Sequence, residues 1–163
     1  MDPTAKLHVP NAIHGFGAGD VNWPGGREVF EWWNTARKDR HFPTRRDFKP
    51  ASMKSILPSI QLTDVGDTPG NYSVRLVGTR ITDALGYDPT GKNLNDLSNT
   101  QQVRAVYDWI VDHKKPVMRL NLPIKLAYNE FQTCSVIILP LGPEGEQVRM
   151  FLLNFHFGKK TML

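Results

Sequence analysis

Few side chains of this sequence are candidates for catalysis, metal binding or redox chemistry. The single cysteine is the first candidate. Cys134 stands between Thr133 and Ser135 in an apolar stretch, with no neighbouring base that would make it a nucleophile by lowering its pKa. One cysteine cannot form an internal disulfide, and it is too few for a thiolate metal cluster. We therefore interpret Cys134 as a buried structural cysteine.

The five histidines lack the spacing of a metal site. His113 stands in the last turn of an expected helix, beside Lys114 and Lys115, where the helix dipole favours a positive charge without any ligand. The other four fall in loops or on a strand: His8, His14, His41 and His156. We expect no bound metal.

No arrangement of a nucleophile with a base stands out in the sequence. The run Gly15–Gly19 has the glycine density of a dinucleotide-binding loop, but no strand precedes it and no helix begins at its end. We interpret it as part of a flexible segment. Asp83 and Asp88 are too isolated to indicate acid–base catalysis, and we expect no catalytic residues.

The net charge of +4 lies in one short stretch. Residues 37–49 hold six basic residues against two acidic ones, so the rest of the chain is neutral. A diffuse nucleic-acid-binding surface would need an excess of basic residues elsewhere as well. We interpret residues 37–49 as a solvated helix end and loop, with nucleic-acid binding through this segment as the alternative.

Length and composition are those of a single globular domain. A chain of 163 residues can fold without a disulfide or metal, and 40% hydrophobic with 22% charged residues argues against general disorder. No apolar run approaches the ~20 residues of a membrane helix. Residues Met1–Lys6 lack the basic region and apolar core of a secretory signal. We expect a soluble cytoplasmic protein.

Periodicity and turn residues predict the elements that would position these side chains. Residues 1–26 hold five of the thirteen glycines and show no period, which is typical of a flexible arm, so we place the domain proper at residues 27–163. A shorter helix is expected over Pro50–Leu57, closed by Pro58. The first helix, over Arg27–Lys38, has an apolar and aromatic face: Val29, Phe30, Trp32, Trp33 and Ala36.

Five strands and two further helices follow. Ile60–Val65 and Tyr72–Val77 are expected to form a hairpin, and a short helix after it ends at Gly86. The strongest helical pattern covers Gln101–Lys114. The chain closes with three strands: Val117–Ile124, Phe131–Leu141 and Val148–Phe157. This order predicts an α+β fold with a five-stranded, mostly antiparallel sheet, the central helices on one face, and an N-terminal helical extension.

This order of elements, and the residues that carry it, resemble a PAS domain. The run Tyr72–Tyr87 is similar to the PAS core, a strand and a short helix with a Gly-Tyr ending. Asp88–Leu97 resembles the segment that follows that core. The resemblance covers about residues 27–157. Most PAS domains carry Asn where Thr79 stands.

Three shorter motifs narrow the resemblance. Phe42–Pro50, Ile56-Leu57-Pro58 and Gly78–Ile81 are similar to a PAS subfamily common in alphaproteobacteria as small stand-alone proteins. That subfamily shares the difference at Thr79. The resemblance therefore implies a bacterial protein of this kind.

The resemblance implies a sensory or protein-interaction module without catalytic activity. It also implies that a ligand would lie between the inner face of the sheet and the helices after the second strand. The side chains expected along this cavity are Leu76, Ile81, Leu85, Val103, Tyr107, Ile110, Met118, Leu120, Cys134 and part of Phe151–Phe155. The same residues could simply pack as a core, and the sequence leaves both interpretations open.

PAS relatives that carry a cofactor have features that this chain lacks. Light-sensing flavin relatives place a reactive cysteine in an Asn-Cys-Arg run on a helix, whereas Cys134 lies in an expected strand. Haem-binding relatives use a histidine on the helix before the third strand, and His113 stands only in the last turn of that helix. We expect no cofactor.

A small α+β cavity enzyme of the isomerase or dehydratase type is the alternative function. Such an enzyme needs a His–carboxylate pair inside its cavity. Here the expected lining is apolar, with Tyr107 and either Arg75 or Arg119 as its polar neighbours. A sensory or interaction module is the interpretation that we prefer.

The sheet predicts an assembly as well. The strand Phe131–Leu141 is apolar on both faces, and the central helices can cover only one of them. The aromatic helix is the available cover, from the same chain or from a second copy. We predict a homodimer whose surface also serves a signalling partner, with an interface formed by Val29, Phe30, Trp32, Trp33, Val136 and Ile138.

Overall fold

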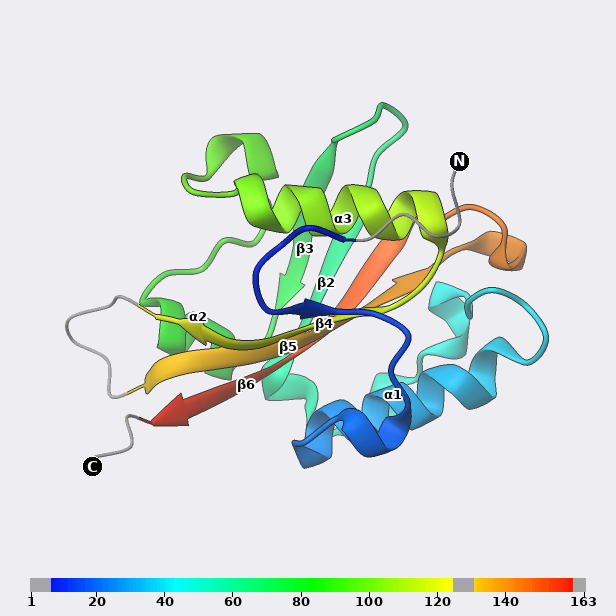
Figure 1. Ribbon diagram of the computed structural model, residues 1–163, viewed down its shortest axis with the longest axis horizontal. Coiled ribbons are helices and arrows are strands. Elements are labelled where there is room, and N and C mark those ends of the chain that lie inside the picture. The colour runs from blue at the N-terminus through cyan, green and yellow to red at the C-terminus, as the bar shows by residue number, and fades with distance from the viewer. Residues whose placement is uncertain (1–6, 125–130, 160–163) are drawn as a thin grey trace.

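The structure, a computed structural model, describes residues 7–124 and 131–159. Within these residues lies an antiparallel sheet of six strands in the order β1-β4-β5-β6-β2-β3 (Figure 1). The strands are β1 (Ala12–Ile13), β2 (Ile60–Val65), β3 (Tyr72–Val77), β4 (Val117–Pro123), β5 (Phe131–Leu141) and β6 (Met150–Lys159). The α+β class and the antiparallel sheet predicted from the sequence are confirmed. The sheet has one strand more than predicted because the short β1 pairs with β4.

Three α-helices accompany the sheet in the described part of the chain: α1 (Pro24–Arg37), α2 (Thr79–Leu85) and α3 (Gln101–His113). α2 ends at Gly86, which adopts the left-handed conformation at a φ of 81°. α3 ends at Lys114, also left-handed, just before Pro116. Both ends lie where the sequence predicts them. Among the described helices, none combines the length and the apolar composition that a membrane span requires.

α1 begins earlier than predicted, at Pro24 rather than at Arg27. Proline suits the first turn of a helix, because the N–H that it lacks would have no helical partner there. Gly26 continues the helix beneath the indole of Trp23, and a Cβ at this position would lie 2.4 Å from that ring. The glycine is therefore a packing requirement rather than a sign of flexibility.

The predicted short helix over Pro50–Leu57 is instead a pair of 3₁₀ turns, Pro50–Met53 and Leu57–Ser59. Pro58 lacks the backbone N–H that would continue an α-helical ladder through this region. Met53 and Ile56 are nevertheless buried, as their spacing predicts.

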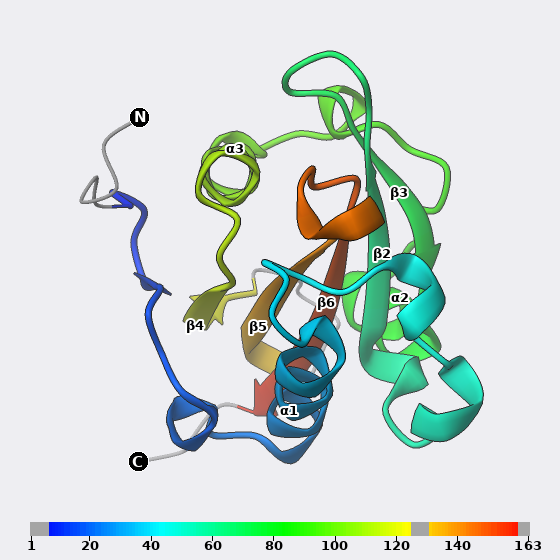
Figure 2. The ribbon, with the colours of Figure 1, turned by 90° about the vertical axis from the view of Figure 1, so that its right-hand side faces the viewer.

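The sheet is covered on both faces. α3 lies over the inner face, where the ring of Tyr107 stacks on Phe151 of β6 at 4.4 Å. α1 packs on β5 and β6 from the other side, the outer face. Figure 2 shows β5 and β6 between α3 and α1. The unbroken apolar run of β5 follows from this, since Ile138 and its neighbour Ile137 are both at most 1% exposed on opposite faces.

The N-terminal segment is part of the same packed unit over the residues that the structure describes. β1 adds to the edge of the sheet at β4, and Val21 and Trp23 are buried in the core. The boundary expected between residues 26 and 27 therefore falls inside α1 and inside the core. Residues 1–6 of the expected arm lie outside the described residues.

Candidate ligand-binding cavity

A cavity of about 280 Å³ lies between α3 and the inner face of the sheet. Strands β2 to β6, the C-terminal end of α2 and the segment that leads into α3 all contribute to its wall. Its apolar lining consists of Val74, Leu85, Pro89, Leu94, Leu97, Val103, Leu122, Val136, Ile138, Leu153 and Phe155. Its polar or partly polar lining consists of Gln61, Thr63, Tyr72, Tyr87, Ser98, Thr100, Tyr107 and Arg119.

Leu85, Val103 and Tyr107 line the cavity as predicted, and so do Leu153 and Phe155 from the predicted stretch Phe151–Phe155. Ile81 and Ile110 are buried elsewhere in the core, at 1% and 0% exposure. In the structure these two residues pack as core residues and do not line the cavity. Cys134 is half-buried at the position opposite Leu122, beside the lining rather than in it.

Leu76 does not line the cavity and is 47% exposed. A shift in the register between β2 and β3 explains this. Thr63 pairs with Val74 and both line the cavity, but the preceding residue Leu62 already pairs with Leu76. The extra residue, Arg75, reverses the alternation of β3, so Leu76 does not follow Val74 onto the inner face.

Met118 and Leu120 were predicted on the inner face because they are the apolar members of an alternating strand. The structure contradicts this assignment, since Arg119 lines the cavity and neither Met118 nor Leu120 does. Met118 pairs with Ile137, on the outer face, and is 1% exposed. The alternation was misleading because both faces of β4 are covered.

Arg119 is 6% exposed and lies at the β4 side of the cavity. Its Nη2 donates to the carbonyl oxygen of Pro10 at 3.1 Å and to Oε1 of Gln102 at 2.7 Å. Its Nε is buried and has no hydrogen-bond partner among the residues that the structure describes. Burial lowers the pKa of the Arg119 guanidinium, and the nearby Cys134 opposes this. From the sequence, Arg119 was predicted only as a possible polar neighbour of the cavity, and no pattern indicated that its side chain points inward.

The other end of the cavity carries a neutral polar group. Nε2 of Gln61 donates to Oγ1 of Thr63 at 3.1 Å. Burial raises the pKa of Tyr107 to about 12, and a hydrogen bond with the Thr63 hydroxyl opposes the rise. Sequence reasoning missed Gln61 and Thr63, because it assigned no residue of β2 to the cavity wall.

The family match agrees with this architecture. A family model described as PAS domain matches residues 21–153, which runs from just before α1 into β6. The chain belongs to the PAS domain family. No curated protein matches the sequence. The resemblance drawn from the sequence is confirmed, while the narrower subfamily stays a prediction.

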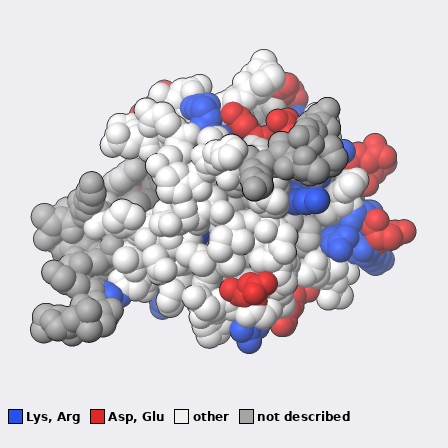
Figure 3. Space-filling view, viewed as in Figure 1, with Lys and Arg blue, Asp and Glu red and all other residues white. Residues whose placement is uncertain are grey.

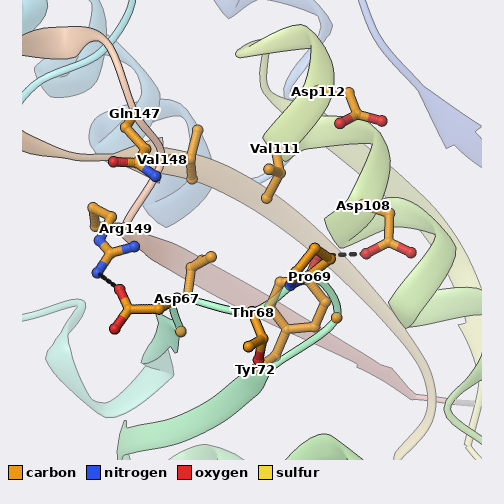
Figure 4. A pocket seen from close by; sticks show the side chains of 13 residues that line it. Asp67, Thr68, Pro69, Tyr72, Asp108, Val111, Asp112, Gln147, Val148 and Arg149 are labelled. Carbon is orange, nitrogen blue, oxygen red and sulfur yellow. Dashed lines mark hydrogen bonds and ion pairs between the residues drawn. The ribbon is translucent and has the colours of Figure 1, made fainter.

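A second, more open hollow of this PAS domain lies at the β2–β3 turn, where α3 and the loop before β6 meet (Figure 4). Two pairs of its polar groups bond one another. Arg149 Nη2 donates to Asp67 at 2.6 Å, and the Tyr72 hydroxyl donates to Asp108. Burial is the main cause that raises the pKa of Tyr72, and the hydrogen bond to Asp108 raises it further. The described residues include no group of acidic, His and Cys side chains placed to hold a metal ion.

The basic segment 37–49 makes local contacts. Arg40 donates to the Ala36 carbonyl at 2.7 Å and to Asp47 at 3.0 Å, and the Arg45 guanidinium lies over the Phe48 ring. The Thr44 backbone N–H, more than Arg40, holds the pKa of Asp47 below its usual value. On the face in Figure 3, Lys and Arg side chains stand beside Asp and Glu side chains and form no continuous basic surface among the residues shown.

The six residues predicted for a dimer interface do not share one exposed surface. Val29, Phe30 and Trp33 are at most 4% exposed, because they form the buried side of α1 within the same chain. Trp32 is half-buried, with its ring edge-on to Phe48 at 5.4 Å. Val136 and Ile138 line the cavity, on the face opposite α1. The homodimer itself stays a prediction.

Proposed function

We propose that this PAS domain is a sensory module that binds a small molecule in the cavity between α3 and the sheet. The observation that carries the proposal is the composition of the cavity wall. Five strands, α2 and α3 each contribute to it, so one bound molecule would touch most elements of the fold. A ligand that contacts many elements can shift the equilibrium between their arrangements, and a protein partner would read that shift.

The absence of catalytic pairs in the wall supports a non-catalytic role. An isomerase or dehydratase of the alternative type would need a histidine and a carboxylate facing each other inside the cavity. The described part of the wall contains no Asp, Glu, His or Lys side chain, and Arg119 is its one arginine. The tyrosine phenol of Tyr107 is held neutral by burial.

The position of His113 supports the expectation that no haem is bound. Its Nδ1 lies 2.9 Å from the Trp109 carbonyl oxygen, and its ring stacks on the Trp109 indole at 4.3 Å. It does not line the cavity. Cys134, in the middle of β5, has its pKa raised by burial to about 11, which keeps the thiol protonated and unreactive at neutral pH. We expect a colourless protein, and a copurifying Soret or flavin absorption band would contradict this.

A neutral fluorescent probe, N-phenyl-1-naphthylamine, tests whether the cavity binds small molecules. We expect its fluorescence to rise on binding to the full chain, and Val103→Phe to abolish the rise because Val103 lines the cavity. Val111→Phe is the matched control, since Val111 is a half-buried valine of the same helix outside this cavity. Equal binding to both variants and the wild type would mean that the probe binds elsewhere, and would overturn the proposal.

A further inference from the structure

The cavity contains a positive charge that nothing in the described structure neutralises. Arg119 is 94% buried, and none of the ion pairs among residues 7–124 and 131–159 includes it. Arginine is almost never buried at this level without an anionic partner, because removing a charge from water is costly. The usual solution, a neighbouring Asp or Glu, is absent from the described cavity wall.

The hydrogen bonds of Arg119 leave it incomplete. Both bonds that it makes come from Nη2 and go to uncharged oxygens, those of Pro10 and Gln102. Nε donates to none of the described residues, and neither does Nη1. The guanidinium is therefore held in place by one nitrogen, while its buried Nε has no acceptor among the described residues and its Nη1 is left available for a ligand. A carboxylate accepts from two donors of one guanidinium, which matches what is missing.

The surroundings of Arg119 indicate the rest of the ligand. In the register of the sheet, Arg119 pairs with Val136, and Val136 pairs with Phe155. The cavity floor beside the charge is therefore apolar across β5 and β6. The neutral pair of Gln61 and Thr63 on β2 lies beyond it, three strand spacings or about 14 Å from β4.

We propose that the cavity binds a small organic carboxylate through Arg119, with an apolar body lying over Val136 and Phe155. This inference rests on the proposed function, since it names the chemistry of the cavity's ligand. One uncompensated cation matches one negative charge, which favours a monocarboxylate over a phosphate monoester that carries nearly two. Gln102 on α3 and the Pro10 carbonyl before β1 are positioning groups, because they hold the guanidinium rather than the ligand.

Two pairs of probes test the proposal by calorimetric titration of the full chain: octanoate with octan-1-ol, and 3-phenylpropanoate with 3-phenylpropan-1-ol. Within each pair the apolar body is the same and only the charge differs. We expect at least one carboxylate to bind the wild type about tenfold more tightly than its alcohol, or more, because hydrogen bonds to a charged group are the stronger ones. Arg119→Gln should remove that advantage and leave the binding of the alcohol unchanged.

Three further variants complete the design. Arg119→Lys keeps the charge and should retain part of the preference for the carboxylate. Arg80→Gln removes one charge from an exposed position on α2 and should leave the binding of both probes as in the wild type. Val103→Phe should weaken the carboxylate and the alcohol alike, because both occupy the cavity. If Arg119→Gln fails to fold, the wild-type comparison within each pair and Arg119→Lys still decide the question.

The outcomes separate this inference from the proposed function. Alcohols that bind as tightly as carboxylates, or an Arg119→Gln variant that keeps the preference, would overturn the role of Arg119 and leave a ligand-binding cavity. If Arg119 had a purely structural role, the carboxylate and the alcohol of each pair would likewise bind with equal affinity. If neither these probes nor N-phenyl-1-naphthylamine binds, both the inference and the proposed function are wrong.

Discussion

At the scale of single residues, Tyr107 is the buried ionisable group whose titration is easiest to follow. It lies on α3 against Phe151 and lines the cavity, and burial raises its pKa to about 12 from an ordinary value of 10.0. The phenol is neutral in the folded state over a range of pH in which the unfolded chain would lose the proton. The fold therefore resists an ionisation that the unfolded state accepts.

The free energy of unfolding therefore falls as the pH rises through this range. The stabilisation is fully present below pH 10 and is lost as the pH rises from about 10 to about 12, because the unfolded state gives up its proton first. We expect Tyr107→Phe to flatten the fall in the free energy of unfolding between pH 9 and 11.5, measured by urea denaturation. Tyr72, whose pKa is also raised, accounts for a slope that remains.

Tyr87→Phe is the control for this prediction. Tyr87 is 51% exposed, and its replacement should leave the pH dependence as it is in the wild type. A Tyr107→Phe variant with the full wild-type slope would show that this phenol does not stay protonated in the fold.

At the scale of elements, α1 is fixed to the outer face by two indole hydrogen bonds as well as by apolar packing. Nε1 of Trp33 donates to the Pro140 carbonyl of β5 at 2.9 Å. Nε1 of Trp23, at the residue before α1, donates to Oδ1 of Asn154 on β6 at 2.7 Å. Asn154 is 1% exposed, so this bond is shielded from water.

We expect Asn154→Ala to lower the free energy of unfolding by about 1–3 kcal/mol, because it leaves a buried indole N–H without an acceptor. Asn22→Ala, at an exposed asparagine next to Trp23, is the matched control and should change the stability little. Urea denaturation of both variants is the measurement. Equal stability of the two would indicate that water reaches the Trp23 indole and satisfies it.

The elements also show how far sequence reasoning reaches. The β2–β3 hairpin, α2 with its Gly86 end, and α3 follow from turn residues and periodicity, which act over a few neighbouring residues. β1 could not be predicted, because a two-residue strand carries no period of its own and depends on the distant β4.

The cavity was only partly predictable for a related reason. Alternation assigns apolar residues to the buried face of a strand, but here both faces are buried. The pattern therefore assigned Met118 to the cavity and left the direction of Arg119 open. In the structure Arg119 lines the cavity and Met118 does not. The reversal at Leu76 depends on a register shift at Arg75, and this shift is a property of strand pairing that the sequence of one strand does not contain.

At the scale of the whole molecule, the question that the sequence raised was what covers the outer face of the sheet. The structure answers that α1 of the same chain covers it, through the contacts of α1 with β5 and β6. An uncovered apolar face is therefore no longer a reason to expect a second copy. The homodimer remains a prediction, and exchange of α1 between two copies is one way in which it could form.

Removal of the cover distinguishes these possibilities. Ile137, Leu139 and Leu152 are each 0% exposed, and a chain that begins after Lys38 would lose the helix over the outer face. Because apolar patches of this kind are rare on soluble monomers, we expect the shortened chain to aggregate or to unfold while the full chain stays soluble. Sedimentation equilibrium of both chains is the measurement. A full chain that stays monomeric at high micromolar concentration would contradict the homodimer, and a shortened chain that is equally soluble and folded would show that α1 is not the cover that its contacts imply.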